Sequence, residues 1–271
     1  ETPPNFLCYG KTGTGKTATI RYVSQRLAEQ NIKNKPWWIY VNCNVVSTPY
    51  RILAHVYNSI VSDEKIPPTG LPKDVIFKRL LGLLDREVES SICFVVLDEI
   101  DMLKDNLDEI LYDLTRINEN LESCRTTLIG ISNKINIKDS LDPRVKSSLG
   151  EEHIVFPSYF ADELTDILND RKSVAFNDDV LKEDVIPLCA ALAAKEHGDA
   201  RKALQLLKKA ASLSQRRQNK RITTKHVKEA QMEIEKDHVV EYIKGLPLQA
   251  QLTLTAIYLM SKFAPKHVIT S

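Results

Sequence analysis

Eight consecutive residues near the amino terminus have the types and spacing of a phosphate-binding loop. The glycines let backbone N–H groups close around phosphate oxygens, and a lysine and a threonine end the stretch. We expect Lys16 to reach the β- and γ-phosphates of a nucleotide and the Thr17 hydroxyl to ligate Mg²⁺. An incidental glycine-rich turn is the alternative, but it would not need the strand before it and the helix after it that the sequence predicts. The predicted nucleotide-binding residues are Gly10, Lys11, Thr12, Gly13, Thr14, Gly15, Lys16 and Thr17, together with Asp98 from a second motif.

That second motif is a pair of adjacent carboxylates at the end of an apolar run. Residues 92–97 are uninterruptedly apolar, as expected of a strand buried on both faces, and Asp98 and Glu99 follow directly. In this Walker B arrangement Asp98 holds the magnesium shell, directly or through water, and Glu99 orients the attacking water. By itself such a pair is also common in acidic loops. Together with the phosphate loop, it predicts nucleotide hydrolysis.

The elements that must position these side chains alternate between strands and helices in the first part of the chain. This alternation favours a parallel sheet covered by helices. One helix is expected to begin with Thr48 as its N-cap and Pro49 at its first position. The predicted strands are 6–9, 37–41, 92–97, 126–132 and 154–156, and the predicted helices run to about residue 30, from 49 through 60, from 73 to 89 and over 107–121.

After Pro157 the strand signals stop and the pattern becomes helical. Helices are predicted at 161–174, 184–197, 199–217 and 223–236, with Asp184 as a cap of the second. A further apolar helix is predicted from near Pro247 to about Met260, and it resembles the start of another domain. The predicted domains are a nucleotide-binding domain at 1–157, a helical lid at 158–244 and a cut-short third domain at 245–271.

Composition restricts the class of protein less than the motifs do. The 271 residues contain 37 Lys+Arg and 36 Asp+Glu, a formal net charge of +1, with ordinary globular fractions of apolar and charged residues. No run approaches the roughly twenty apolar residues of a membrane span, and no secretory leader is expected. Five widely spaced cysteines indicate buried free thiols in a reducing compartment, and the histidines lack metal-ligand spacing.

The balanced total conceals two oppositely charged stretches. Residues 98–122 hold nine Asp/Glu and two Lys/Arg, whereas residues 195–236 hold twelve Lys/Arg and five Asp/Glu. The basic stretch can contact DNA phosphates, or it can be an ordinary solvated helical surface. A second candidate set of DNA contacts is Lys73, Lys78 and Arg79. His197 and His226 are expected to be surface groups, and Trp37 and Trp38 are expected to pack in the core.

At the level of whole motifs the chain resembles a known family. The phosphate loop together with Val96-Leu97-Asp98-Glu99-Ile100-Asp101 looks like an AAA+ ATPase. The stretches Ser132-Asn133, LDPRVKSSL at 141–149 and GDARKAL at 198–204 are similar to the origin-recognition and cell-division-control replication initiators, most of all the archaeal ones. PPTGL at 67–71 resembles the loop of that family's extra helical insertion. The resemblance covers essentially the whole chain. It implies an α/β fold, with an AAA+ αβα parallel-sheet domain, an all-helical lid and the start of a truncated winged-helix domain.

Three more site residues follow from the resemblance. Asn133 matches the sensor-one residue that hydrogen-bonds the γ-phosphate or the lytic water, although an Asn after a strand can also simply form a turn. Arg201 matches the sensor-two arginine, whose planar guanidinium suits phosphate oxygens; the alternative is a solvated Arg on a basic helix. Arg144 resembles the arginine finger that acts on a neighbouring subunit's nucleotide, and a surface or phosphate-contacting role stays open.

The resemblance also implies a function and partners. The expected cofactors are ATP/ADP and Mg²⁺, with slow, switch-type hydrolysis. The expected partners are double-stranded origin DNA, the minichromosome maintenance helicase and a second initiator protomer or paralogue, but no membrane. An archaeal member would be cytoplasmic and nucleoid-associated, and a eukaryotic one nuclear. The alternatives are a DNA-independent AAA+ or signalling ATPase that assembles protein complexes, and a clamp-loader-like subunit.

Overall fold

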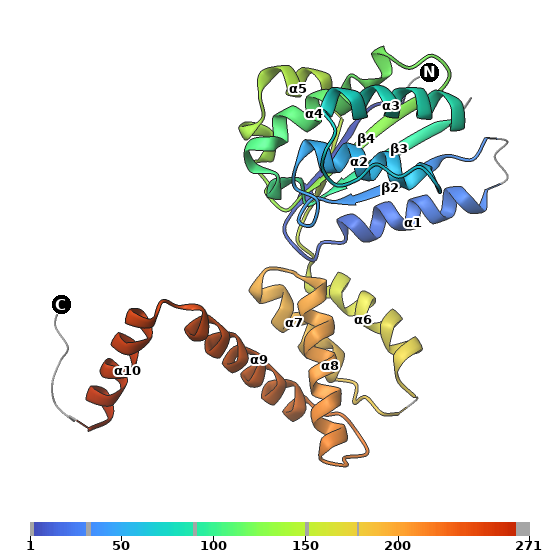
Figure 1. Ribbon diagram of the computed structural model, residues 1–271. Helices are drawn as coiled ribbons and strands as arrows, with labels where there is room; N and C mark the ends of the chain where they lie inside the picture. Colours follow the sequence, from blue (N-terminus) through green and yellow to red (C-terminus); the bar gives the residue numbers. More distant parts are fainter. Residues whose placement is uncertain (1–2, 31–33, 89–90, 150–151, 178, 264–271) are drawn as a thin grey trace. The chain divides into compact units, whose positions relative to one another are not determined.

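A computed structural model describes residues 3–30, 34–88, 91–149, 152–177 and 179–263 (Figure 1). The chain forms two compact units. The first contains the residues up to Tyr159 and, in addition, His197–Ala200. The second contains Phe160–Glu196 and the residues from Arg201 onward. The sequence assigned 197–200 to the helical lid, whereas their contacts group them with the first unit.

A parallel sheet forms the centre of the first unit. Its strands are β1 (Phe6–Gly10), β2 (Trp37–Asn42), β3 (Ile92–Asp98), β4 (Arg125–Ser132) and β5 (His153–Phe156), in the spatial order β2-β3-β4-β1-β5. All five predicted strands are confirmed. In the register Tyr9 pairs with Ser132 and Leu97 with Gly130, so β1, β3 and β4 end at the same edge. Loops at the carboxyl edge of a parallel sheet are where ligands bind.

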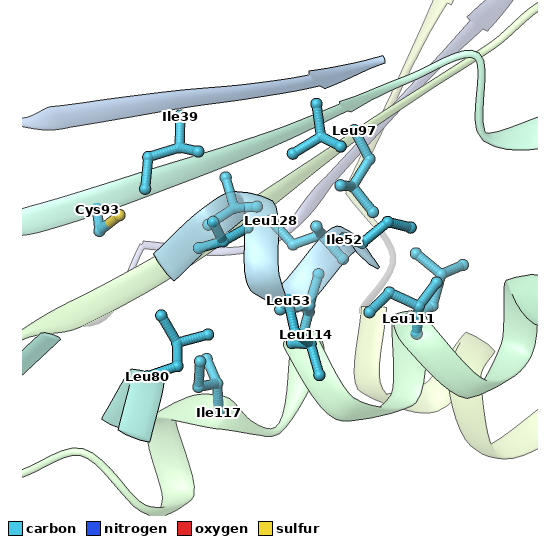
Figure 2. Close-up of a cluster of buried hydrophobic side chains, with 14 of the residues drawn as sticks. Ile39, Ile52, Leu53, Leu80, Cys93, Leu97, Leu111, Leu114, Ile117 and Leu128 are labelled. Carbon is cyan, nitrogen blue, oxygen red and sulfur yellow. The ribbon is translucent and has the colours of Figure 1, made fainter. Parts of the chain in front are cut away.

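Helices cover both faces of this sheet (Figure 1). The larger core lies on the face that packs against α2 (Pro49–Ile60), α3 (Lys73–Glu87), α4 (Leu107–Thr115) and α5 (Pro143–Leu149). Figure 2 shows its centre, where Ile39, Leu97 and Leu128 of the sheet meet Ile52, Leu80 and Leu111 of the helices. Thr48 caps α2, since its hydroxyl accepts the N–H of Arg51 at 3.4 Å, and Pro49 occupies the first turn as predicted.

The opposite face is covered by α1 (Lys16–Glu29) and has a smaller core. Trp38 stacks on Phe94 there with ring centroids 4.3 Å apart, as expected of a core residue. The same prediction is wrong for Trp37, which is exposed because it lies at the start of the edge strand β2. All five cysteines are buried and free, and burial raises the pKa of each thiol, to about 11 for Cys8 and about 12 for Cys43.

One predicted helix is shorter than expected. The sequence predicts a helix over 107–121, but α4 ends at Thr115 and a 3-10 turn, Ile117–Glu119, follows. Within that turn the Asn118 amide donates to the Thr126 carbonyl at 2.7 Å and accepts the Thr126 N–H at 2.8 Å. These bonds tie the turn to the start of β4. The predicted helix therefore ends early, where its last residues contact the distant strand β4 instead.

Among its described residues, the second unit is made of helices and one isolated β-bridge between Leu181 and Ile222. It contains α6 (Ala161–Ala175), α7 (Val185–Glu196), most of α8 (Ala200–Arg216), α9 (Thr224–Gly245) and α10 (Leu248–Phe263). The helix predicted at 223–236 continues to Gly245, because neither glycine nor proline interrupts it earlier. None of the described α10 side chains is buried. The assignment of residues 245–271 to a winged-helix domain stays a prediction, and residues 264–271 lie outside the described part.

The prediction of His226 as a surface group is wrong, because its side chain is buried. Its side chain is only 4% exposed and lies in the first turn of α9. The ring Nδ1 accepts the backbone N–H of Thr223 at 3.1 Å, and Nε2 is 2.8 Å from the Asn219 amide nitrogen. Because the ring caps the helix and joins it to the preceding loop, burial is compatible with its polarity. His197 is exposed as predicted. Within the described ranges, no helix is long and apolar enough to cross a membrane.

Candidate nucleotide-binding site and charged surfaces

The predicted phosphate loop connects β1 to α1 and is folded around the ammonium group of Lys16. Lys16 is 5% exposed, and its Nζ donates to the carbonyl oxygens of Gly10 at 2.8 Å and Lys11 at 2.6 Å. The Thr14 hydroxyl also donates to the Lys11 carbonyl, at 2.9 Å. The loop therefore holds a cation at the amino end of α1, where the helix dipole also favours an anion.

The two Walker motifs meet through Thr17 and Asp98. The Thr17 hydroxyl donates to Asp98 Oδ2 at 2.8 Å, and the Asp98 Oδ1 accepts the N–H of Glu99 at 3.0 Å. A hydroxyl and a carboxylate are hard oxygen donors, the type that Mg²⁺ binds while keeping several of its waters. Mg-ATP fits this donor set: Thr17 and Asp98 would hold the ion, and Lys16 with the loop N–H groups would hold the phosphates.

Glu99 has a backbone conformation that is uncommon for its type. Its φ and ψ of 58° and 45° are left-handed, a region that a residue with a Cβ rarely adopts. A short 3-10 turn, Ile100–Met102, begins directly after it. Such outliers gather at functional sites, because the surrounding structure must hold them in place. Here the turn directs the chain away from β3 immediately after the two predicted catalytic carboxylates.

Asn133 lies at the same edge of the sheet, at the end of β4. Its backbone N–H donates to Asp101 Oδ1 at 3.0 Å, and the hydroxyl of Ser132 donates to the same oxygen at 3.1 Å. The structure therefore brings the phosphate loop, Asp98, Glu99 and Asn133 to one edge of the sheet, and their catalytic roles stay predictions. It adds Asp101, to which the sequence reasoning gave no role. The signal was available, since Asp101 lies in the same motif, three residues after Asp98.

A second contribution that the sequence did not predict comes from the segment His197–Ala200. The N–H of Ala200 donates to the Gly13 carbonyl at 3.2 Å, and the N–H of Tyr159 donates to the Gly198 carbonyl at 3.2 Å. Gly13 has a φ of +72°, and a Cβ on it would lie 1.7 Å from Asp199 Oδ1. A side chain at position 13 is therefore excluded by the Asp199 carboxylate as well as by backbone strain. This segment forms part of the wall around the phosphate loop.

The nucleotide-site roles of the two predicted arginines stay predictions. Arg201 is the first residue of the second unit after Ala200, so its contact with a nucleotide stays a prediction. Arg144 lies on α5 with its side chain 79% exposed, and it pairs with Asp142 through Nε at 3.1 Å and Nη2 at 3.2 Å. These hydrogen bonds lower the pKa of Asp142. An exposed guanidinium suits a role toward another molecule, which stays a prediction.

Lys73, a candidate DNA contact, is engaged within its own unit, so a contact with DNA stays a prediction. Its ammonium lies between two carboxylates of α4, 2.5 Å from Glu109 and 2.9 Å from Asp113. Partial burial opposes the charged form, but the hydrogen bonds to both carboxylates outweigh it and raise the pKa of Lys73. The lysine therefore links α3 to α4 through these two carboxylates. Lys78 and Arg79 are exposed on α3 and stay candidates.

The basic stretch in the second unit contains two kinds of cation. Lys202, Lys209 and Arg217 pair with acidic side chains of the same unit, at 3.0 Å, 3.1 Å and 2.6 Å respectively. Apart from Arg201, the others are exposed and form no ion pair with any residue that the structure describes: Lys195, Lys208, Arg216, Lys220, Arg221, Lys225, Lys228 and Lys236. Four of these follow one another around the turn from α8 into α9, which gives one end of the unit a concentrated positive charge.

Two family models match the chain in the order of its two units. Residues 1–136 match the AAA domain, and residues 165–232 match the Cdc6 AAA+ ATPase-type lid domain. The ORC1-type DNA replication protein 1 of Methanosarcina acetivorans is 45% identical over 263 residues, which cover 96% of this chain and 62% of that protein. The corresponding protein of Pyrococcus abyssi is 48% identical over 267 residues, covering 97% and 63%. The chain thus spans less than two thirds of the length of these relatives.

Solved structures agree with these matches. The Aeropyrum pernix ORC1 protein, solved in complex with DNA, has a TM-score of 0.81 and 44% identity, covering 97% of this chain and 68% of that one. Cdc6p from Pyrobaculum aerophilum shares the fold, with a TM-score of 0.72 at 24% identity. With relatives this similar along almost its entire length, the chain belongs to the ORC1/Cdc6 family of DNA replication proteins within the AAA+ ATPases.

Proposed function

We propose that this protein is an ATP-dependent replication initiator. In this proposal it binds double-stranded origin DNA and uses ATP binding and slow hydrolysis as a conformational switch. The observation that carries the ATP part is the 2.8 Å hydrogen bond from the Thr17 hydroxyl to Asp98 Oδ2. It supports the reading of the Walker motifs as one assembled site and not two coincidental sequence matches.

Each residue at the sheet edge has a task in this proposal. Lys16 and the loop N–H groups bind the phosphates and orient the γ-phosphoryl group. Glu99 orients the attacking water, and the Asn133 amide holds that water or a γ-phosphate oxygen. When bound, Mg²⁺ neutralises charge that develops on the phosphate oxygens. Arg201 would supply a second cation from the lid, and this dependence on the lid is what makes ATP a switch.

DNA binding is supported by the exposed cations and by a relative. The turn from α8 into α9 carries Arg216, Lys220, Arg221 and Lys225 without ionic partners among the described residues. Such a cluster neutralises several phosphates and releases their counterions. The A. pernix ORC1 protein, 44% identical, was solved in complex with DNA. A helicase of the minichromosome maintenance type and a second initiator protomer or paralogue belong to the same proposal, with Arg144 facing the neighbouring protomer.

Two variants test the ATP site. Lys16→Ala removes the buried cation and is expected to abolish nucleotide binding, measured by titration with a fluorescent ADP analogue. Glu99→Gln keeps the phosphate ligands and is expected to preserve binding while stopping turnover. Lys35→Ala is the control, because Lys35 is also a lysine of the first unit but is exposed and is not among the predicted site residues. Normal ATP hydrolysis by both Lys16→Ala and Glu99→Gln would refute the assigned site.

The DNA part needs its own test, since an ATPase that only assembles proteins has the same Walker site. Fluorescence anisotropy would compare origin duplex with scrambled duplex at two salt concentrations, with and without ATP. The proposal expects tighter binding to origin duplex and affinity that falls with salt. Flat curves for the intact protein would leave the DNA-independent switch or the clamp-loader-like role as the better function.

A further inference from the structure

We propose that Asp101 is a positioning residue for hydrolysis: its buried carboxylate sets the place of Asn133 relative to the Walker B pair. The inference rests on the proposed role of Asn133 and goes beyond it, because Asp101 itself need not touch nucleotide, metal or water. A side chain that senses a γ-phosphate must be held to within a fraction of an ångström of its working place. Asp101 provides that constraint through the backbone on which Asn133 is mounted.

The contacts at the end of β4 show how the carboxylate acts. Asp101 is 8% exposed, and its Oδ1 accepts the N–H of Asn133 at 3.0 Å and the Ser132 hydroxyl at 3.1 Å. The Ser132 oxygen in turn accepts the N–H of Lys134 at 3.0 Å. One carboxylate oxygen therefore holds Ser132 and Asn133 directly, and Lys134 through the Ser132 hydroxyl, where the chain leaves the sheet.

The other end of the connection is the Walker B strand. Asp101 lies in the 3-10 turn Ile100–Met102, which begins immediately after Glu99. The turn is held to Glu99 by the Met102 N–H, 2.9 Å from the Glu99 carbonyl, and by the fully buried side chain of Ile100. The position of the Asp101 carboxylate thus follows that of Asp98 and Glu99 closely. β3 and β4 are neighbours in the sheet, and Asp101 connects them beyond their last paired residues.

The Asp101 carboxylate does not serve to balance a nearby positive charge. Asp101 forms no ion pair with the residues that the structure describes, and the two donors to its Oδ1 are a neutral amide and a neutral hydroxyl. An amide oxygen can accept the same two hydrogen bonds. If position is what matters, Asn at this place preserves the function, whereas a side chain without an acceptor loses it. This distinguishes positioning from any role for the negative charge.

The experiment measures kcat and KM for ATP and the Kd for ADP in the intact protein. Asp101→Ala is expected to lower kcat by about tenfold to a hundredfold, the range that a misplacement of roughly 1 Å produces, with the Kd changed less than about threefold. Asp101→Asn is expected to restore kcat to within about twofold of the wild type. The matched control is Asp105→Ala. Asp105 lies in the next 3-10 turn, and its exposed carboxylate has no partner among the described residues.

A double substitution separates this inference from the function on which it rests. In an Asn133→Ala background, adding Asp101→Ala is expected to lower kcat no further, because Asp101 acts through Asn133. An additional loss as large as in the wild type would overturn the positioning role, and so would a low kcat for Asp101→Asn, even if Asp101→Ala did not fold. A normal kcat for Asn133→Ala alone would instead refute the proposed sensor.

Discussion

The acidic stretch of the first unit and the basic stretch of the second use their charges differently. Most carboxylates of residues 98–122 accept hydrogen bonds within their own unit: Asp98, Asp101, Asp108, Glu109, Asp113 and Glu119. Most cations of residues 195–236 face solvent without an ionic partner among the described residues. Two stretches with equal and opposite net charge therefore have different structural roles. The acidic charges hold segments of the first unit together, whereas the basic charges are available to a ligand.

The largest expected effect concerns the unpaired cations. Arg216→Ala, Lys220→Ala and Arg221→Ala together are expected to weaken duplex binding on the order of a hundredfold at low salt and to lower the slope of log affinity against log salt by about three. Thermal unfolding should not change, because these side chains form no ion pair within the described chain. Anisotropy titration over a salt series measures the slope.

The paired cations provide the matched control for that experiment. Lys202→Ala, Lys209→Ala and Arg217→Ala remove the same formal charge, but their charges are already balanced by Glu196, Glu233 and Glu229. Their loss should change the salt slope much less. Equal slopes for the two triple variants would show that total charge governs binding, and not the cations that lack an ionic partner. The distinction between paired and unpaired cations would then not matter for DNA binding.

A smaller effect is expected where a carboxylate holds backbone in the first unit. Asp85 accepts the N–H groups of Glu122, Ser123 and Cys124, with Ser123 nearest at 2.8 Å. Burial alone would raise the pKa of Asp85, but these three bonds outweigh it and lower the pKa below the ordinary 3.8. We expect Asp85→Ala to reduce the free energy of unfolding by about 1–3 kcal/mol at neutral pH.

The pH dependence of this effect has a definite sign. A carboxylate with a lowered folded-state pKa stabilises the fold fully above its unfolded pKa, and the contribution is lost as pH falls through the lower folded value. The difference in unfolding free energy between the wild type and Asp85→Ala should therefore be constant near neutrality and shrink below about pH 4. Denaturant unfolding at several pH values measures it. A difference that grew toward acid would contradict the account of Asp85.

The smallest effect on stability and nucleotide affinity is expected at Arg144. Its pair with Asp142 is exposed and well screened, so Arg144→Ala should leave the Tm and the Kd for nucleotide unchanged. If the exposed guanidinium acts on a neighbouring protomer, the variant should still lose ATP turnover at protein concentrations where protomers associate. Mixing it with a Glu99→Gln partner, and measuring turnover against protein concentration, separates a role in trans from none. Unchanged turnover in every mixture would remove Arg144 from the site.

The strands and Walker residues could be predicted because their signals are local. The apolar run before Asp98 and the glycines of the phosphate loop can each be recognised from a few neighbouring residues. Parallel pairing of the strands then places the carboxyl ends of those strands at one edge. Lys73, His226 and Asp199 could not be assigned in this way. Their surroundings come from α4, from the loop before α9 and from Gly13, and single-sequence patterns do not reveal which distant segments will meet.

The segment 197–200 means that the nucleotide domain is discontinuous in the sequence. The chain leaves it at Tyr159, forms α6 and α7 and returns for four residues, of which Asp199 and Ala200 adjoin Gly13. A protein cut after residue 159 would keep every Walker residue yet lose one wall of the loop that carries them. Exchange of lids between relatives would likewise replace part of the nucleotide site. The border of the nucleotide domain therefore does not fall at a single point in the sequence.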